Sequence, residues 1–482
     1  MTQPFVREHL YLDGAWVAPA TDRVIEVVSP HTEAVVGRVP EASTADVDRA
    51  VAAARRVADD GSWASRPPAE RGAILDRAAD LLEARADEVA ELITAEMGCT
   101  ITFSRTAQVT SPLRNLRYYA ELARTTEFVE ERRSDGRLTL IRKEPVGVTA
   151  AIIPWNVPMM MSVGKVAPAL VAGCPVVLKP SPEAPLDSFI LAEVFHEAGL
   201  PAGAFNLVPA DREVSEHLVR HPDVDKVTFT GSTAAGRRIA SICGDRLARV
   251  NLELGGKSAA IVLEDAPVVE TVAKLVPMAF ILNGQACMAQ TRILVPESRR
   301  AEYVDAFAEA IGELRVGDPA DETTDIGPLV AERQRDRAEA YIAAGREAGA
   351  RVVVGGGRPE VMDRGWYLEP TLFDGVTNDM TIAREEIFAP VLCLTSYRDL
   401  DEAVALANDS DYGLSGSVWT DDVERGVEVA SRIRTGGVSV NGAIQAVGAP
   451  FGGMKASGIG REQGPEGLAQ FFELKSVAVP AT

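Results

Sequence analysis

The sequence predicts an α/β protein with a doubly wound, Rossmann-like parallel sheet, a second α/β domain after it, and a small β arm. Three observations lead to this prediction. With 482 residues, the chain is too long for a single hydrophobic core. Strand-like and helix-like runs alternate over 146–242, and a second alternation follows over 258–440. Two strand-like segments, 124–145 and 471–477, lie outside both alternations.

The N-terminal part of the chain contains two kinds of segment. Residues 1–40 carry short strand and turn signals, and Tyr11–Trp16 is typical of a hairpin tip. From Ala45 to Gly98 the chain is rich in alanine, and its apolar residues recur at helical spacing. We therefore expect short strands followed by a helical scaffold.

Residues 124–145 return to strand signals around Ser134-Asp135-Gly136, a sequence typical of a tight hairpin turn. Both sides of this turn are charged. Such a hairpin fits either an arm that pairs with a partner or a solvated surface hairpin. The tail at 471–477 alternates as a strand does, so it can pair with the hairpin in its own chain or in a neighbour.

The first alternation predicts a parallel sheet covered by helices. Strands are expected at 146–153, 175–178, 205–208 and 226–229, and helices at 159–172, 186–198, 214–220 and 233–242. Ligands of such sheets bind at the carboxyl ends of the strands. Three polar motifs lie at these ends: Pro154-Trp155-Asn156, Lys179-Pro180-Ser181 and Thr230-Gly231-Ser232. The second alternation has strand signals near 258–262, 291–295, 391–397, 416–419 and 437–440.

Bulk composition narrows the class of protein. Hydrophobic and charged contents of 46% and 25% are ordinary for a soluble globular protein. The net charge of -21 argues against a nucleic-acid partner and favours small molecules or further copies of the chain. The most apolar stretch, Val146–Leu178, is broken by prolines and carries Lys165, which indicates buried core and no membrane span.

Cysteine and histidine usage argues against metal sites and disulfides. The five cysteines are far apart and include no Cys-x-x-Cys pair, so a reducing, cytoplasmic compartment fits best. His217 and His221 are helix-spaced but lack the glutamate of a zinc motif, and we expect surface residues. The first residues lack the apolar core that a signal peptide needs, and we expect none.

The segment from Asn283 to Arg292 places Cys287 in a turn between an apolar helical run, Val268 to Leu282, and a strand-like run, Ile293 to Val295. Neither periodicity buries it, which is where a reactive thiol is expected. The alternative is a small buried hydrophobe, the usual state of a free cysteine. Residues elsewhere in the chain decide between the two.

Three further features of the sequence are of the kind that a catalytic site around Cys287 would need. Gly231 and Ser232 follow a strand and open a helix, so they fit either a phosphate site or plain helix capping. Glu253 lies at a strand end beside glycines that leave room around its carboxylate, as a general base requires, or it is a structural carboxylate. Asn156 is an amide in an apolar stretch, suited to an oxyanion or to a buried turn.

Together these residues resemble the NAD(P)-dependent aldehyde dehydrogenases over essentially the whole chain. The matching motifs, in the family's order and near its spacing, are Pro154-Trp155-Asn156, Lys179-Pro180-Ser181, Phe229-Thr230-Gly231-Ser232, Glu253-Leu254-Gly255-Gly256-Lys257, Gly284-Gln285-Ala286-Cys287, Glu385-Glu386-Ile387-Phe388 and Pro450-Phe451-Gly452-Gly453. The resemblance implies an NAD(P)-binding domain at 1–123 and 146–254, a catalytic domain at 255–448, and an oligomerisation arm at 124–145 and 466–482. It also implies a homodimer or homotetramer.

The resemblance implies specific roles. Cys287 attacks the aldehyde, Asn156 and the Cys287 amide stabilise the oxyanion, hydride passes to the cofactor, and Glu253 activates the water that hydrolyses the thioester. Lys165 matches a lysine near the active site, and its role stays open. The residues expected at the cofactor are Pro154, Trp155, Lys179, Ser181, Gly231, Ser232, Leu254, Gly255, Glu386 and Phe388.

Two departures from the family pattern affect the expected choice of cofactor and the backbone after Phe388. Pro182 stands where many NAD-preferring members carry glutamate, and Glu183 is displaced by one, so the cofactor is expected to be NAD, with NADP possible. Ala389 replaces the glycine usual after the Phe388 position, where we expect a small backbone adjustment.

The family's entrance tunnel implies an apolar substrate here. Its expected lining is Val157, Met160, Met161, Ile281, Met288 and Phe451. We predict an apolar aliphatic or aromatic aldehyde over a charged semialdehyde. One alternative is a CoA-acylating semialdehyde dehydrogenase, which Glu253 argues against. Another is a non-catalytic structural or binding member of the family, which the complete set of Cys287, Glu253 and Asn156 argues against.

Overall fold

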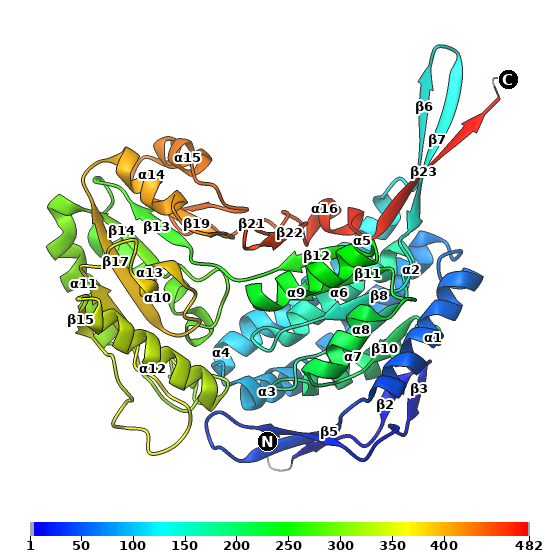
Figure 1. The fold of residues 1–482 in the computed structure, drawn as a ribbon, viewed down its shortest axis with the longest axis horizontal. Helices are drawn as coiled ribbons and strands as arrows, with labels where there is room; N and C mark the ends of the chain where they lie inside the picture. The colour runs from blue at the N-terminus through cyan, green and yellow to red at the C-terminus, as the bar shows by residue number, and fades with distance from the viewer. Residues whose placement is uncertain (1–3, 481–482) are drawn as a thin grey trace.

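The computed structural model describes residues 4–480, and two large sheets organise them. In Figure 1 these sheets lie in two lobes, and a β arm projects from one of them. The first sheet has eight strands in the order β22-β12-β11-β8-β9-β10-β2-β3. Its strands are β2 (Leu10–Leu12), β3 (Ala15–Val17), β8 (Thr149–Ile152), β9 (Val176–Lys179), β10 (Phe205–Leu207), β11 (Lys226–Thr230), β12 (Arg249–Glu253) and β22 (Gly458–Ile459).

The central strands β12, β11, β8, β9 and β10 are parallel, which confirms the predicted parallel sheet. Strands β8 and β9 are buried along their whole length, so their sequences are near-continuous apolar runs. The helices of this half of the chain are α1 (Thr44–Asp60), α2 (Pro68–Glu83), α3 (Ala86–Met97), α4 (Ile101–Phe103), α5 (Thr110–Thr125), α6 (Pro158–Ala172), α7 (Leu186–Glu197), α8 (Arg212–Arg220) and α9 (Thr233–Asp245), with a π-helix at Ser104–Val109.

The second sheet has seven strands in the order β15-β16-β17-β14-β13-β19-β20. They are β13 (Ala259–Val262), β14 (Arg292–Pro296), β15 (Arg351–Val354), β16 (Thr371–Asp374), β17 (Val391–Tyr397), β19 (Gly416–Trp419) and β20 (Ser439–Val440). Only β15 runs antiparallel to its neighbour. The helices around this sheet are α10 (Val268–Ala279), α11 (Arg300–Gly312), α12 (Glu332–Glu347), α13 (Thr381–Arg384), α14 (Leu400–Asn408) and α15 (Val423–Ser431), with 3-10 turns at Ile281–Gly284 and Glu297–Arg299.

The arm is a three-stranded sheet of β6 (Val129–Ser134), β7 (Arg137–Pro145) and β23 (Phe472–Val479). Asp135 and Gly136 both have positive φ, as a two-residue hairpin turn requires. The tail strand β23 pairs antiparallel with β7 of its own chain, which is one of the two pairings that the sequence allows. The arm projects outward from the lobe that contains the eight-stranded sheet (Figure 1).

Short elements complete the fold. They are the small sheet of β1 (Phe5–Val6), β4 (Val24–Val28) and β5 (Val35–Pro40), the pair β18 (Tyr412–Gly413) and β21 (Met454–Lys455), and helix α16 (Gly464–Ala469). None of the helices within residues 4–480 is long and apolar enough to cross a membrane.

Two boundaries predicted from the sequence are wrong. The strand expected at 146–153 begins only at Thr149, because Gly147 has a φ of 115° and the Val148 amide donates to the Asp225 carboxylate. The helical run expected to reach Leu282 ends at Ala279, where the backbone turns into a left-handed segment. The hairpin at Tyr11–Trp16 is confirmed, but its joining of the eight-stranded sheet was not predicted.

Candidate active site

The polar motifs of the first sheet meet at one edge. Strands β12, β11, β8 and β9 are adjacent and parallel, so their carboxyl ends share that edge. The predicted residues that end or follow these strands are Glu253, Leu254, Gly255, Gly231, Ser232, Pro154, Trp155, Asn156, Lys179 and Ser181. The sheet order therefore brings together residues that are up to about a hundred positions apart in the sequence.

Helix α9 begins at this edge with Ser232 as its N-cap. The Ser232 hydroxyl accepts from the Ala235 amide at 3.3 Å, and Gly236 packs so closely that a Cβ there would lie 2.4 Å from Leu254 Cδ2. The remaining first-turn amides of α9 are free for an anion, since a helix leaves its first N–H groups unpaired. Capping and anion binding are therefore compatible at this helix start.

Lys179 and Ser181 lie at the end of β9, beside the carboxylate of Glu183. In the sequence, Glu183 is displaced by one position from the glutamate of the motif. Glu183 accepts a hydrogen bond from the Ser181 hydroxyl and pairs with Arg333 of α12. Burial lowers the pKa of Lys179 to about 8, and the carboxylates of Glu183 and Asp211 oppose this shift. The Arg333 pair joins the first half of the chain to the second at this point.

Glu386 and Phe388 face the same edge from the second half of the chain. Glu386 Oε1 accepts from the Gly256 amide at 2.9 Å, and a Cβ on Gly255 would lie 2.3 Å from Glu386 Oε2. Burial raises the pKa of Glu386 to about 7. Phe388 has a φ of 61°, and its ring packs edge-on against Trp155 at 5.4 Å between centroids.

Cys287 differs from the other cysteines in its exposure. Cys99, Cys174, Cys243 and Cys393 are buried, whereas Cys287 is half-buried. Burial, together with the nearby charges of Glu386 and Glu253, raises the pKa of its thiol to about 12. The thiol is therefore neutral at rest, and a base must remove its proton before it can act as a nucleophile.

Asn156 is buried and fixed from two directions. Its Nδ2 donates to the Gln285 carbonyl at 2.8 Å, two residues before Cys287. Its backbone carbonyl accepts a hydrogen bond from Nε2 of Gln108, a residue of the π-helix, at 2.9 Å. Because an asparagine amide carries two N–H donors, one remains for a further acceptor beside the Cys287 loop.

Glu253, the last residue of β12, is 2% exposed. Within residues 4–480 both of its carboxylate oxygens are buried without a hydrogen-bond partner. Burial raises the pKa of Glu253 to about 9; the charge of Glu462 adds to this shift, and Lys165 and Arg461 oppose it. A buried carboxyl with free oxygens can take a proton from a thiol or from water.

The glycines that make room for this carboxylate are not the ones expected. Gly255 and Gly256 were predicted to leave space around Glu253, but side chains there would collide first with Glu386 and with the Cys287 carbonyl. The residue that contacts the carboxylate is Gly452, whose Cβ would lie 2.7 Å from Glu253 Oε1. Sequence separation hides this contact, because Gly452 comes from a distant loop.

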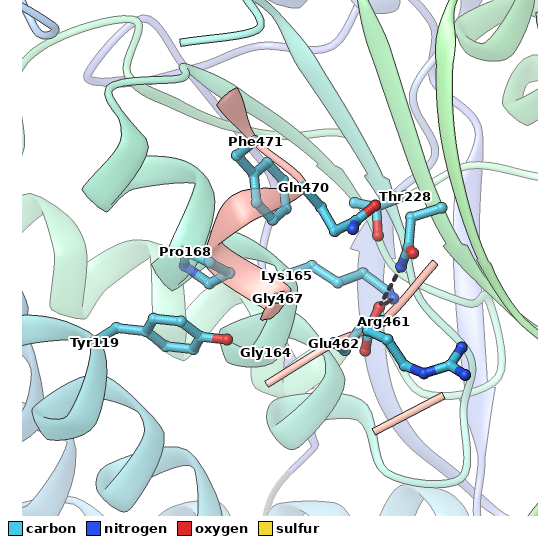
Figure 2. A pocket seen from close by; sticks show the side chains of 11 residues that line it. Tyr119, Gly164, Lys165, Pro168, Thr228, Arg461, Glu462, Gly467, Gln470 and Phe471 are labelled. Carbon is cyan, nitrogen blue, oxygen red and sulfur yellow. Dashed lines mark hydrogen bonds and ion pairs between the residues drawn. The ribbon is translucent and has the colours of Figure 1, made fainter. Parts of the chain in front are cut away.

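Lys165 lies near enough to Glu253 to influence its pKa, and it forms a buried ion pair with Glu462. Asn251 Nδ2 donates to the same carboxylate oxygen at 3.3 Å. Figure 2 shows the Lys165 and Glu462 side chains pointing toward each other at a small cavity that Tyr119 also lines. Glu462 was missed in the sequence, where its only signal is an isolated carboxylate in the glycine-rich run 452–464.

The predicted tunnel residues fall into two sets. Val157, Met160 and Ile281 are partly buried and pack on the apolar cluster that contains Met161. Met288 is 40% exposed, and Phe451 pairs with Glu462 through an isolated β-bridge. Val157, Met160, Met161 and Ile281 therefore belong to one apolar cluster, and Met288 and Phe451 lie outside it. Within the described part of the chain, no group of His, Cys, Asp or Glu side chains is arranged to hold a metal ion.

Comparison with known proteins decides the family. The sequence profile described as "Aldehyde dehydrogenase family" matches residues 16–477. The chain belongs to the aldehyde dehydrogenase family. Among its relatives, geranial dehydrogenase of Castellaniella defragrans is 50% identical over 401 residues, which cover 83% of each chain. The 3-succinoylsemialdehyde-pyridine dehydrogenase of a Pseudomonas species is 44% identical over 399 residues, 82% of this aldehyde dehydrogenase and 83% of that one.

Solved structures confirm the predicted fold class for this aldehyde dehydrogenase. A Mycobacterium tuberculosis aldehyde dehydrogenase in complex with NAD+ superposes with a TM-score of 0.98 at 46% identity, covering 99% of each chain. A mutant of aldehyde dehydrogenase C from Pseudomonas syringae, in complex with NAD+ and octanal, gives a TM-score of 0.95 at 44% identity, covering 98% of this chain and 96% of that one. The protein is thus an oxidoreductase of the NAD-binding aldehyde dehydrogenase type.

Proposed function

We propose that this enzyme oxidises apolar aliphatic or aromatic aldehydes to carboxylic acids with NAD+, through a thiohemiacetal and a thioester on Cys287. The observation that supports this most is the arrangement at one edge of the sheet. There the half-buried Cys287 lies near Glu253, whose buried carboxylate oxygens have no partner within residues 4–480.

In the acylation half, the Glu253 carboxylate takes the thiol proton, and Cys287 Sγ forms a bond to the aldehyde carbon. The carbonyl oxygen becomes an oxyanion, which accepts from the free N–H of Asn156 and from the Cys287 amide. NAD+, when bound, supplies the acceptor for the hydride that the tetrahedral carbon then loses. The carbon–oxygen double bond reforms, and Cys287 holds a thioester.

Before deacylation, Glu253 releases the thiol proton to solvent. It then takes a proton from water as the hydroxide oxygen bonds to the thioester carbon. Collapse of this second adduct breaks the carbon–sulfur bond, Glu253 returns its proton to the Cys287 sulfur, and the carboxylic acid leaves. The same two donors hold the second oxyanion. Glu253 therefore acts twice, and its raised pKa suits a group that must accept and return protons.

We assign Lys165 an electrostatic role. Its ammonium stabilises the ionised form of Glu253, whereas the Glu462 carboxylate favours the protonated form. Because Lys165 and Glu462 are paired, their effects on the Glu253 carboxyl oppose each other. Burial, the largest cause, raises the pKa of the base to about 9, and Lys165 limits that rise.

The edge residues fit a dinucleotide. The first-turn amides of α9 and Ser232 suit the pyrophosphate, Lys179 and Ser181 suit the adenosine ribose, and Glu386 suits the nicotinamide ribose. Pro154, Trp155, Gly231, Leu254, Gly255 and Phe388 line the same edge. We propose NAD+ over NADP+, because the Glu183 carboxylate beside Lys179 opposes a 2′-phosphate.

The substrate class follows from the expected tunnel. None of Val157, Met160, Met161, Ile281, Met288 and Phe451 carries a charge, so the tunnel favours apolar aldehydes. Two relatives support an apolar aldehyde as substrate, since one is named for geranial and the structure of another contains octanal.

An aldehyde panel tests this proposal. We expect larger kcat/KM values for hexanal, octanal and benzaldehyde than for succinate semialdehyde, and larger values with NAD+ than with NADP+. The measurement is NADH or NADPH absorbance at matched aldehyde concentrations. Faster turnover of succinate semialdehyde than of hexanal would rule out the apolar assignment.

Asn156→Ala should lower the rate of the NADH burst by about 10²- to 10³-fold, since it removes one oxyanion donor. The measurement is stopped-flow absorbance, with NAD+ affinity measured separately by fluorescence. Asn206→Ala, at another buried amide that bonds backbone carbonyls far from Cys287, is the control. A burst at the wild-type rate in the folded Asn156 variant would remove this residue from the mechanism.

We also propose the division into a cofactor domain at 1–123 and 146–254, a catalytic domain at 255–448, and an oligomerisation arm at 124–145 and 466–482. The sheets and the projecting arm support this division. A homodimer or homotetramer assembled through the arm is part of the same proposal.

A further inference from the structure

The backbone before Cys287 contains three consecutive residues in the left-handed region. Leu282 has φ 55° and ψ 40°, Asn283 has φ 58° and ψ 34°, and Gly284 has a φ of 76°. A left-handed leucine is strained, and such a conformation persists only where surrounding contacts fix it. The contacts that fix this turn are therefore informative.

Asn283 supplies the first set of contacts. Its side chain is buried, and Nδ2 donates to the Gly98 carbonyl at 2.9 Å and to the Pro328 carbonyl at 3.0 Å. Its Oδ1 accepts from the Gly327 amide at 2.8 Å. The side chain thus ties the turn to the end of α3 and to the loop before α12.

Gln285 supplies the second set. It is fully buried, its Oε1 accepts from the Val330 amide at 3.0 Å, and its Nε2 donates to the Leu282 carbonyl at 3.3 Å. Its own carbonyl is the acceptor for Asn156 Nδ2. Gln285 therefore joins the strained turn, the 326–331 loop and the oxyanion amide in one network.

We propose that Asn283 and Gln285 are positioning residues that hold the left-handed turn and thereby set the Cys287 thiol against the Asn156 amide. The inference rests on the proposed function, because it takes Cys287 as the nucleophile. Neither side chain touches the thiol in the contacts above, so both act through the backbone. Reaction rates fall steeply when reacting groups lose their alignment, even without loss of substrate binding.

Asn283→Gly is the sharpest test, because glycine keeps the left-handed backbone accessible and removes only the side-chain bonds. We expect the NADH burst rate and kcat to fall by about 10- to 100-fold, with aldehyde KM and the Kd for NAD+ nearly unchanged. Released from the turn, the thiol becomes more exposed, so alkylation of Cys287 by iodoacetamide should rise by about threefold or more. Unfolding would also speed alkylation, but of all five cysteines, so a rise confined to the Cys287 peptide separates release of the turn from loss of the fold.

Asn441→Gly is the matched control. Asn441 is also left-handed, with a φ of 52°, and its side chain bonds the Thr420 amide and carbonyl at 3.0 and 2.8 Å. This variant should lose thermal stability and keep the wild-type burst and alkylation rates. If Asn283→Gly does not fold, Gln285→Glu takes its place as the test. It keeps the acceptor for the Val330 amide and removes the donor to the Leu282 carbonyl. We expect the same fall in burst rate and the same rise in Cys287 alkylation.

Wild-type burst and alkylation rates in either folded variant would overturn the proposal. Failure of the proposed function looks different. If Cys287 is not the nucleophile, Cys287→Ala keeps the wild-type burst of NADH, whatever the turn variants do. If only the positioning role is wrong, Cys287→Ala abolishes the burst and the turn variants react normally.

Discussion

Replacing Cys287 with alanine is expected to lower NADH formation from an aldehyde by roughly four to six orders of magnitude. Without sulfur there is no thiohemiacetal, and the aldehyde carbon has no route to the tetrahedral state from which hydride leaves. The other cysteines are buried, so none can substitute for it. The measurement is steady-state NADH absorbance with hexanal, together with the Kd for NAD+, which should not change.

Cys243→Ala is the control for this variant. Cys243 lies buried on α9 and takes no part in the proposed chemistry, so the variant should keep wild-type turnover. Turnover by the Cys287 variant within about tenfold of wild type would contradict the covalent mechanism, because removal of a nucleophile lowers the turnover rate far more than this.

Replacing Glu253 with glutamine should uncouple the two halves of the reaction. We expect up to one equivalent of NADH per subunit in a burst slower than that of the wild type, followed by steady-state turnover reduced by about 10²- to 10⁴-fold. The amide occupies the same space beside Gly452 but cannot accept a proton from water. Stopped-flow absorbance resolves both phases. Sustained wild-type turnover would show that another group activates the water.

The wild-type enzyme should depend on pH in the direction that the Glu253 pKa sets. Burial raises this pKa to about 9, and only the ionised carboxylate can accept a proton. Turnover limited by Glu253 should therefore rise with pH below about 9, nearly tenfold per unit at the lower end, and then level off. The rise should disappear from the residual turnover of the glutamine variant. A profile that is flat between pH 6 and 9 would contradict this assignment.

Much of the fold could be predicted from local patterns. The strands β9, β10, β11, β17 and β19 coincide with predicted runs to within about two residues, because buried parallel strands are apolar throughout and bounded by turns. The two-residue turn at Asp135-Gly136 is equally local. Predictions failed where distant contacts set the backbone, as at Gly147, which Asp225 displaces from the strand.

The candidate site divides in the same way. Cys287, Glu253 and Asn156 could be found because their residue types and short motifs carry the chemistry. The partner of Lys165 could not, since Glu462 lies 297 positions away and only the fold brings the two together. The same holds for Gly452 at the Glu253 carboxylate and for the left-handed turn at Asn283. Periodicity indicates which face of an element is apolar, but it does not indicate which residues distant in the sequence will lie in contact.

The central claim is that an acyl group passes through the sulfur of Cys287. The most direct measurement is peptide mass analysis of the Glu253→Gln enzyme, quenched after mixing with NAD+ and hexanal. We predict that the peptide containing Cys287 carries a hexanoyl group, which hydroxylamine removes as expected for a thioester. An unmodified Cys287 peptide alongside a full burst of NADH, or a hexanoyl group on a different residue, would contradict the account.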